Sequence, residues 1–128
     1  AAAAADAEGG DEIALSNTEM TSEAVCTLAA ALPARPRLRA LDLSHNHLGS
    51  DGVQAIAAHL RHLPALERLN LAATGAGDGG ASAVAAAVGA CPRLRLLSLM
   101  GAFVKDAGAI ALARALGDLP HLEELSLG

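Results

Sequence analysis

Hydrophobic and polar positions alternate in a short segment that returns every 28 positions along this chain. In residues 38–44 the alternation predicts a strand with Leu41 and Leu43 facing inward and Ala40, Asp42 and Ser44 facing outward, because successive side chains of a strand point to opposite faces. The leucine columns that keep this spacing are Leu38, Leu66, Leu94 and Leu122, and Leu15, Leu43, Leu71, Leu99 and Leu127. A fixed period of this size predicts a solenoid, in which each unit packs only against its neighbours.

A second apolar pattern, at helical spacing, follows each alternating segment. Its columns are Leu28, Ile56, Val84 and Leu112; Leu32, Leu60, Val88 and Leu116; and Ala29, Ala57, Ala85 and Ala113. The constant alanine predicts a close approach between neighbouring helices. Side-chain oxygens favour the helix N-cap, and the predicted caps are Ser22, Ser50, Asp78 and Asp106. A proline then ends each helix, at Pro36, Pro64, Pro92 and Pro120. Strands should therefore stack in parallel on one face, with helices on the other.

The period divides the chain into a tail and a repeat domain. Residues 1–10 are rich in Ala and Gly and fall outside the pattern, so we expect a flexible tail or linker. Residues 11–128 hold four units, at 11–37, 38–65, 66–93 and 94–121, and the start of a fifth at 122–128. The chain begins without Met and stops within a unit that lacks a polar cap. We therefore expect these units to be part of a longer array.

The repeated residues resemble the leucine-rich repeat, in its 28-residue ribonuclease-inhibitor-like form. The second unit carries Leu38-x-x-Leu41-x-Leu43-x-x-Asn46-x-Leu48-Gly49, and a helix is expected to follow. This resemblance implies an α/β horseshoe with a concave parallel sheet and convex helices. It also implies that the Asn46 column ties each strand-to-turn segment into a hydrogen-bonded ladder. The other units have Thr18, Thr74 and Ala102 in this column. Ala102 cannot make such bonds, so the turn at 101–105 is expected to be looser or reshaped.

Composition narrows the class of partner. The net charge is −5 and the chain has no run of Lys or Arg, which disfavours a nucleic-acid groove. No apolar run is long enough for a membrane span, and no signal peptide is visible. The two cysteines, Cys26 and Cys91, lie more than two units apart, beyond the reach of a disulfide. We expect reduced thiols and a cytoplasmic protein.

Three groups of residues resemble catalytic or ligand-binding motifs, but each lacks a feature that such a motif requires. Asp42, Ser44 and His45 are nearly consecutive, so the histidine cannot lie between the other two as a catalytic triad requires. The pairs His45/His47 and His59/His62 have metal-like spacing but lack a completing Cys or carboxylate. Residues 75–80, Gly-Ala-Gly-Asp-Gly-Gly, imitate a phosphate loop without its Lys-Ser/Thr ending. We expect no catalytic, cofactor or metal site.

The resemblance instead implies a protein-interaction scaffold that binds other proteins, as a subunit of a larger complex such as a cytoskeletal or ciliary assembly. The residues expected on the concave face as partner contacts are Asp42, Ser44, Arg68, Asn70, Leu96, Ser98, Met100 and Glu124. The first two units and the last are small or acidic on this face, which favours a partner with a basic patch. Two alternatives are a GTPase-regulating domain like the Ran activator and the ligand-sensing end of a NOD-like receptor.

Overall fold

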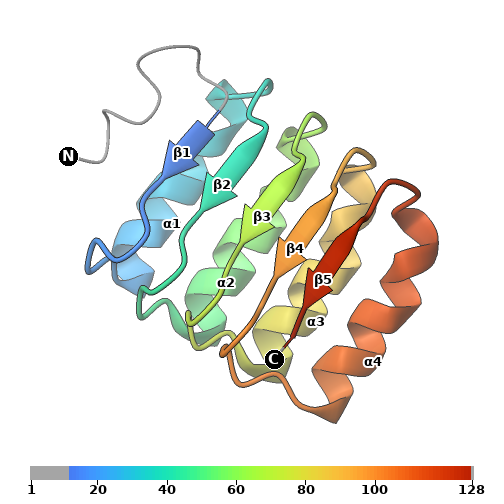
Figure 1. Ribbon diagram of the computed structural model, residues 1–128. Coiled ribbons are helices and arrows are strands. Elements are labelled where there is room, and N and C mark those ends of the chain that lie inside the picture. Colours follow the sequence, from blue (N-terminus) through green and yellow to red (C-terminus); the bar gives the residue numbers. More distant parts are fainter. Residues whose placement is uncertain (1–11, 128) are drawn as a thin grey trace.

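A computed structural model describes residues 12–127 of the chain, and within them five short strands form one parallel sheet (Figure 1). The strands lie side by side in chain order, and each residue pairs with its counterpart in the next unit, as Ile13 pairs with Leu41. Their bounds are β1 (Glu12–Ala14), β2 (Ala40–Asp42), β3 (Arg68–Asn70), β4 (Leu96–Ser98) and β5 (Glu124–Ser126). The sequence period is therefore the register of the sheet.

Helices connect successive strands and form a second layer on one face of the sheet, as Figure 1 shows. Their bounds are α1 (Ser22–Ala31), α2 (Gly49–Ala58), α3 (Gly77–Ala87) and α4 (Asp106–Ala115). A 3-10 turn follows each helix, at Leu32–Ala34, Leu60–His62, Val88–Ala90 and Leu116–Asp118. This arrangement confirms the predicted α/β repeat solenoid, with the sheet exposed on the face away from the helices.

The core lies between the two layers and follows the predicted columns. Leu41 and Leu69 point inward from β2 and β3 and are fully buried, as are Leu43 and Leu71 directly after these strands. Ile56 and Leu60 are fully buried on the helix side. The alanine column is less uniform, since Ala29 and Ala57 are buried whereas Ala113 is exposed. The closest approach between helices falls instead on a glycine column, which was not predicted. A Cβ added to Gly80 would lie 2.8 Å from the Cβ of Ala76 and 3.1 Å from a methyl of Val53.

The predicted helix caps are wrong by one or two positions. Ser22 and Asp106 are the first residues of α1 and α4, and Ser50 and Asp78 are the second residues of α2 and α3. The residues at the cap positions are Thr21, Leu48, Ala76 and Lys105. The middle helices begin early because Gly49 and Gly77, both at positive φ, turn the chain into the helix one residue sooner.

The polar column after each strand forms a ladder centred on Asn46. Its Nδ2 donates to the carbonyls of Leu15 and Leu43, at 2.9 and 3.0 Å, and its Oδ1 accepts from the backbone N–H groups of Thr18 and Met20. Thr74 makes one bond of this kind, from its hydroxyl to the carbonyl of Leu71. Thr18 likewise donates to the carbonyl of Leu15, in its own unit.

The turn at 101–105 is reshaped relative to the two turns before it. Its cap, Lys105, is extended, whereas the aligned Gly49 and Gly77 have positive φ, and α4 begins one residue later in its unit than α2 and α3 do. The first turn, which ends in Thr21, behaves in the same way although it has Thr18 in the ladder column. The start of the helix therefore depends on whether a glycine stands at the position of Lys105, and not on Ala102.

Two further expectations can be compared with the structure. Cys26 and Cys91 are both free thiols, as the sequence analysis expected. No helix among residues 12–127 is both long enough and apolar enough to span a bilayer.

Candidate functional site on the sheet surface

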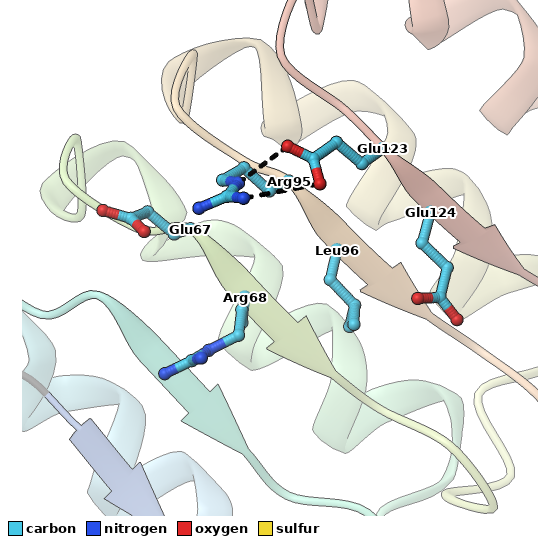
Figure 2. A pocket seen from close by; sticks show the side chains of 6 residues that line it. All are labelled: Glu67, Arg68, Arg95, Leu96, Glu123 and Glu124. Carbon is cyan, nitrogen blue, oxygen red and sulfur yellow. Dashed lines mark hydrogen bonds and ion pairs between the residues drawn. The ribbon is translucent and has the colours of Figure 1, made fainter.

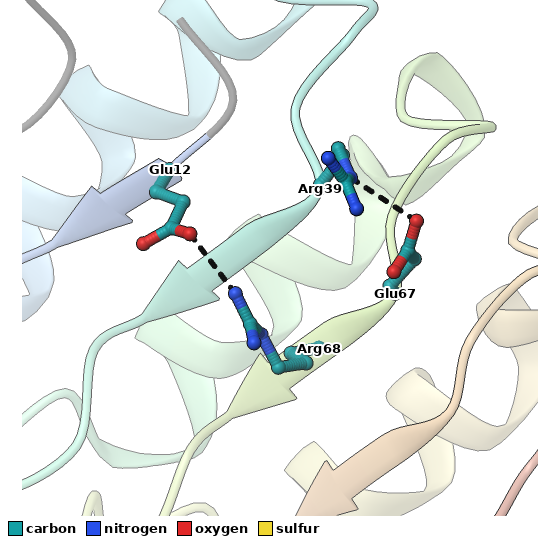
Figure 3. A network of polar contacts seen from close by, with 4 residues as sticks. All are labelled: Glu12, Arg39, Glu67 and Arg68. Atoms are coloured by element: carbon teal, nitrogen blue, oxygen red, sulfur yellow. Dashed lines mark hydrogen bonds and ion pairs between the residues drawn. The ribbon is translucent and has the colours of Figure 1, made fainter. Parts of the chain in front are cut away.

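A column of alternating charge runs along the edge where the strands begin. It contains Arg39, Glu67, Arg95 and Glu123, each one unit after the last. The Nε of Arg39 lies 3.1 Å from a carboxylate oxygen of Glu67, and the Nε of Arg95 lies 2.9 Å from one of Glu123 (Figures 2 and 3). The hydrogen bond from Arg39 lowers the pKa of Glu67, and Arg95 and Arg68 add to this effect. The hydrogen bond to Glu123 raises the pKa of Arg95.

A second pair crosses the sheet surface itself. Arg68 of β3 lies 3.0 Å from the carboxylate of Glu12 on β1, and reaches over β2 to do so (Figure 3). The register places Ala40 between these two residues. Because Ala40 is small, it leaves room for the long arginine side chain. Arg68 is thereby held near a carboxylate and directed away from β4.

A hollow of about 210 Å³ opens beside this pair, on β3 to β5. Figure 2 shows Leu96 between Arg68 and Glu124, with Arg95 and Glu123 joined along the strand starts. Among the described residues, Glu124 has no ion-pair partner. The residues that line the hollow are Glu67, Arg68, Arg95, Leu96, Glu123 and Glu124.

A second hollow, of about 380 Å³, continues across β1 to β4. It shares Arg68 and Leu96 with the first and adds Asp42 and Asn70. Asp42 accepts hydrogen bonds from the backbone N–H and the hydroxyl of Ser44, and no cation neutralises it in the part of the chain that the structure describes. The two hollows form one open surface, here called the sheet groove, with an apolar centre at Leu96 and unneutralised carboxylates at Asp42 and Glu124.

The structure brings five of the expected contact residues together in the sheet groove: Asp42, Arg68, Asn70, Leu96 and Glu124. Ser98 is half-buried on β4 and lines neither hollow. Met100 is 52% exposed and lies beyond the end of β4, outside the groove.

Ser44 offers almost no surface to a partner. Only 3% of it is exposed, because its hydroxyl donates to Asp42 at 2.6 Å and lies 3.0 Å from the hydroxyl of Ser16. No hydrogen bond joins His45 to either residue in residues 12–127, so the catalytic-triad geometry is absent there.

Three groove residues, Glu67, Arg95 and Glu123, were not predicted, because they lie just before the strands, outside the alternating positions. The signal that could have found them is the reversal of charge from each unit to the next. Phe103 is a further surface residue that was not predicted. Phe103 is 76% exposed and has a φ of +62°, an uncommon conformation for a bulky side chain.

The paired histidines and the glycine-rich turn both take part in packing contacts. The rings of His59 and His62 lie 6.0 Å apart, and the described residues contain no group of three or more His, Cys, Asp or Glu side chains that could hold a metal ion. The glycine-rich turn at 75–80 serves packing, since Gly80 lies against Val53 of the preceding helix.

Comparison with known proteins supports the repeat fold. Residues 36–57 match the family model described as "Leucine Rich repeat". A solved structure, "Leiomodin-1 Actin-Binding Site 2 (ABS2)", superposes with a TM-score of 0.81 at 18% sequence identity, over 94% of this chain and 72% of that one. A search of curated proteins gave no match. Together with the register of the sheet, these findings support a leucine-rich repeat protein, and hence a protein-interaction repeat domain.

Proposed function

We propose that the sheet groove is the concave binding surface of a scaffold, and that it holds a protein partner with a basic patch. The observation that carries this proposal is that two carboxylates of the groove have no cationic partner among residues 12–127. Arg68 and Arg95 are each paired with a carboxylate, whereas Asp42 and Glu124 have no cationic partner within residues 12–127. A lysine or arginine of the partner would neutralise these carboxylates while an apolar side chain covers Leu96.

We further propose that this scaffold belongs to a larger, cytoplasmic assembly, of which a cytoskeletal complex is the first candidate. The structural neighbour is, by its description, an actin-binding site of leiomodin-1. Purified actin is therefore the first partner to test, by co-sedimentation with filaments and by a binding assay with monomers. No particular observation favours the GTPase-regulating or receptor alternatives. A GTP-hydrolysis assay distinguishes a GTPase-regulating domain from a scaffold.

The location of the binding surface can be tested by photo-crosslinking in cells. A photoreactive amino acid replaces Leu96 in the groove, and a matched variant carries it at Ala86, an exposed position on α3. We expect a protein that crosslinks from position 96 and not from position 86. The charge reversal Glu124→Lys should abolish this crosslink, because it repels the partner's basic patch. Equal crosslinking from both positions would show that the groove is not the binding surface.

A further inference from the structure

The edge of the sheet where the strands begin carries most of the positive charge of this acidic chain. It is formed by the 3-10 turns and by the loops that lead into the strands (Figure 1). The net charge of the chain is −5, yet six of its nine lysine and arginine residues stand on this edge. They are Arg35, Arg37, Arg39, Arg61, Arg93 and Arg95.

A repeated motif accounts for four of these arginines. The sequence Pro-Arg-Leu-Arg occurs at residues 36–39 and again at residues 92–95. The second arginine of each copy, Arg39 or Arg95, is held by a glutamate of the following unit. The side chain of the first arginine, Arg37 or Arg93, is exposed and makes no hydrogen bond or ion pair with any residue from 12 to 127. Contacts within the fold therefore give these two arginines no role.

The register of the loops brings the two free arginines into one row. In each loop, the N–H of the leucine before the strand donates to the carbonyl three residues earlier, at 3.1 to 3.2 Å. Arg37, Ala65 and Arg93 thus stand at the same place in successive units. Because neighbouring parallel strands are about 5 Å apart, the Cα atoms of Arg37 and Arg93 are about 10 Å apart. Ala65 ends at its Cβ, so no long side chain separates the two guanidinium groups.

We propose that this row, formed by Arg37, Ala65 and Arg93 and here called the arginine row, binds an acidic segment of a partner protein. Each guanidinium group takes one carboxylate of the segment, through the paired N–H···O bonds that arginine forms with carboxylates. The two carboxylates lie about 10 Å apart, which is close to two turns of an α-helix.

The charges beside the arginine row favour a protein over a nucleic acid or a membrane. Glu67 and Glu123 stand in the alternating column that runs next to the row. These carboxylates repel the continuous phosphates of a nucleic acid or of an anionic bilayer. A protein segment can instead pair its carboxylates with the two arginines and place neutral or cationic side chains next to the glutamates.

The arginine row lies along the direction in which the units stack. The five strands lie side by side in chain order, and the row follows the same order. A further unit at either end of the array extends this edge and does not cover it. The row is also separate from the sheet groove, for which a basic partner is proposed, so either proposal can fail without the other.

The probe for this test is a fluorescein-labelled oligoglutamate peptide, and fluorescence anisotropy measures its binding to the full chain at low salt. We expect saturable binding that Arg37→Glu and Arg93→Glu each weaken about fivefold, and that added NaCl also weakens. The matched control is Lys105→Glu, which changes the net charge equally at the start of α4, on the opposite edge. It should change the affinity by less than about twofold.

Equal losses for Arg93→Glu and Lys105→Glu would overturn the proposal, because net charge alone would then explain the binding. The absence of saturable binding would also overturn it. Binding to phosphatidylserine vesicles that Arg37→Glu and Arg93→Glu abolish would assign the row to a membrane surface instead. Self-association in sedimentation that Arg93→Glu abolishes would assign it to a second copy of the chain. Circular dichroism shows that each variant remains folded.

Discussion

Asn46 stands out among single residues because one side chain satisfies backbone groups of two units. It is 1% exposed, and its amide bonds to the backbone of the first unit at Leu15, Thr18 and Met20. The same amide also bonds to the carbonyl of Leu43 in its own unit. Asn46→Ala would leave the buried N–H groups of Thr18 and Met20 without this acceptor. We expect the free energy of unfolding to fall by about 2–4 kcal/mol, measured by urea denaturation.

Thr74→Ala is the matched control for this column. Thr74 makes one hydrogen bond to the carbonyl of Leu71, and the aligned Ala102 shows that alanine fits the same turn position. The loss should be about 1 kcal/mol. Equal losses for both variants would mean that Asn46 does not join two units.

The Cys91 thiol gives a pH dependence that can be measured. Burial raises the pKa of Cys91 to about 11, from an ordinary value of 9.0. The folded protein therefore keeps this proton over a range in which the unfolded chain loses it. The contribution of the protonated Cys91 thiol to the free energy of unfolding is fully present below pH 9 and is lost as the pH rises from 9 toward 11. Urea denaturation at about pH 8 and about pH 10.5 checks this, and the difference should shrink in Cys91→Ala.

Thiol labelling provides an independent measurement at the same scale. Cys26 is exposed and Cys91 is buried. A thiol reagent at about pH 8 should therefore modify one cysteine of the folded protein quickly and the second only after unfolding. Rapid modification of both would contradict the burial of Cys91.

The distance between neighbouring helices depends on the glycine column where they cross. Gly80 lies so near Ala76 and Val53 that an added methyl must push one of them away. We expect Gly80→Ala to destabilise the protein by about 1–3 kcal/mol, despite the intrinsic helix preference for alanine. The measurement is again urea denaturation.

Gly117→Ala controls for the backbone effect of glycine, since a Cβ there meets nothing within 4 Å. Its effect should stay within about 0.5 kcal/mol. The double variant Val53→Ala with Gly80→Ala should lose less stability than the sum of the two single losses, because Val53→Ala removes a methyl group 3.1 Å from the new Cβ. If Gly80→Ala is as neutral as Gly117→Ala, close packing does not set the helix spacing.

Strands and helices were predictable because a repeated pattern averages out local ambiguity. Leu41, Leu69 and Leu97 each mark the same inward position, so several copies of one weak signal become a strong one. Helix starts were not predictable to the residue, because Gly49 and Gly77 change the turn while Thr21 and Lys105 do not. The glycine column was not predicted, because glycine within a helix usually indicates low helix propensity and not a close contact between helices.

The candidate site was only partly predictable. Strand alternation identified Arg68, Leu96 and Glu124, because it depends on backbone geometry alone. It could not show that Arg68 reaches Glu12 across Ala40, since this pair spans two units and depends on side-chain length. The burial of Ser44 beneath Asp42 and Ser16 likewise depends on contacts between units.

When residues 1–128 are studied on their own, unfolding should begin at the two outer repeats. In a solenoid each unit is stabilised by its neighbours, so terminal units have one neighbour fewer. Helix α2 buries Gly52, Val53, Ile56 and Ala57, whereas α1 buries only Val25 and Ala29. Hydrogen exchange should therefore be slowest in α2 and α3 and faster in α1 and α4. Uniform protection of all four helices would indicate all-or-none unfolding instead.

The alternating charge column gives the molecule two different periods. The strand pairing repeats with every unit, so a gene that lost or gained one unit would still encode a well-registered sheet. The charges Arg39, Glu67, Arg95 and Glu123 repeat only with every second unit. Loss of one unit would set Arg39 beside Arg95, and like charges on neighbouring strands repel. In this column, the smallest segment that can be duplicated or deleted without bringing like charges together is therefore a pair of repeats.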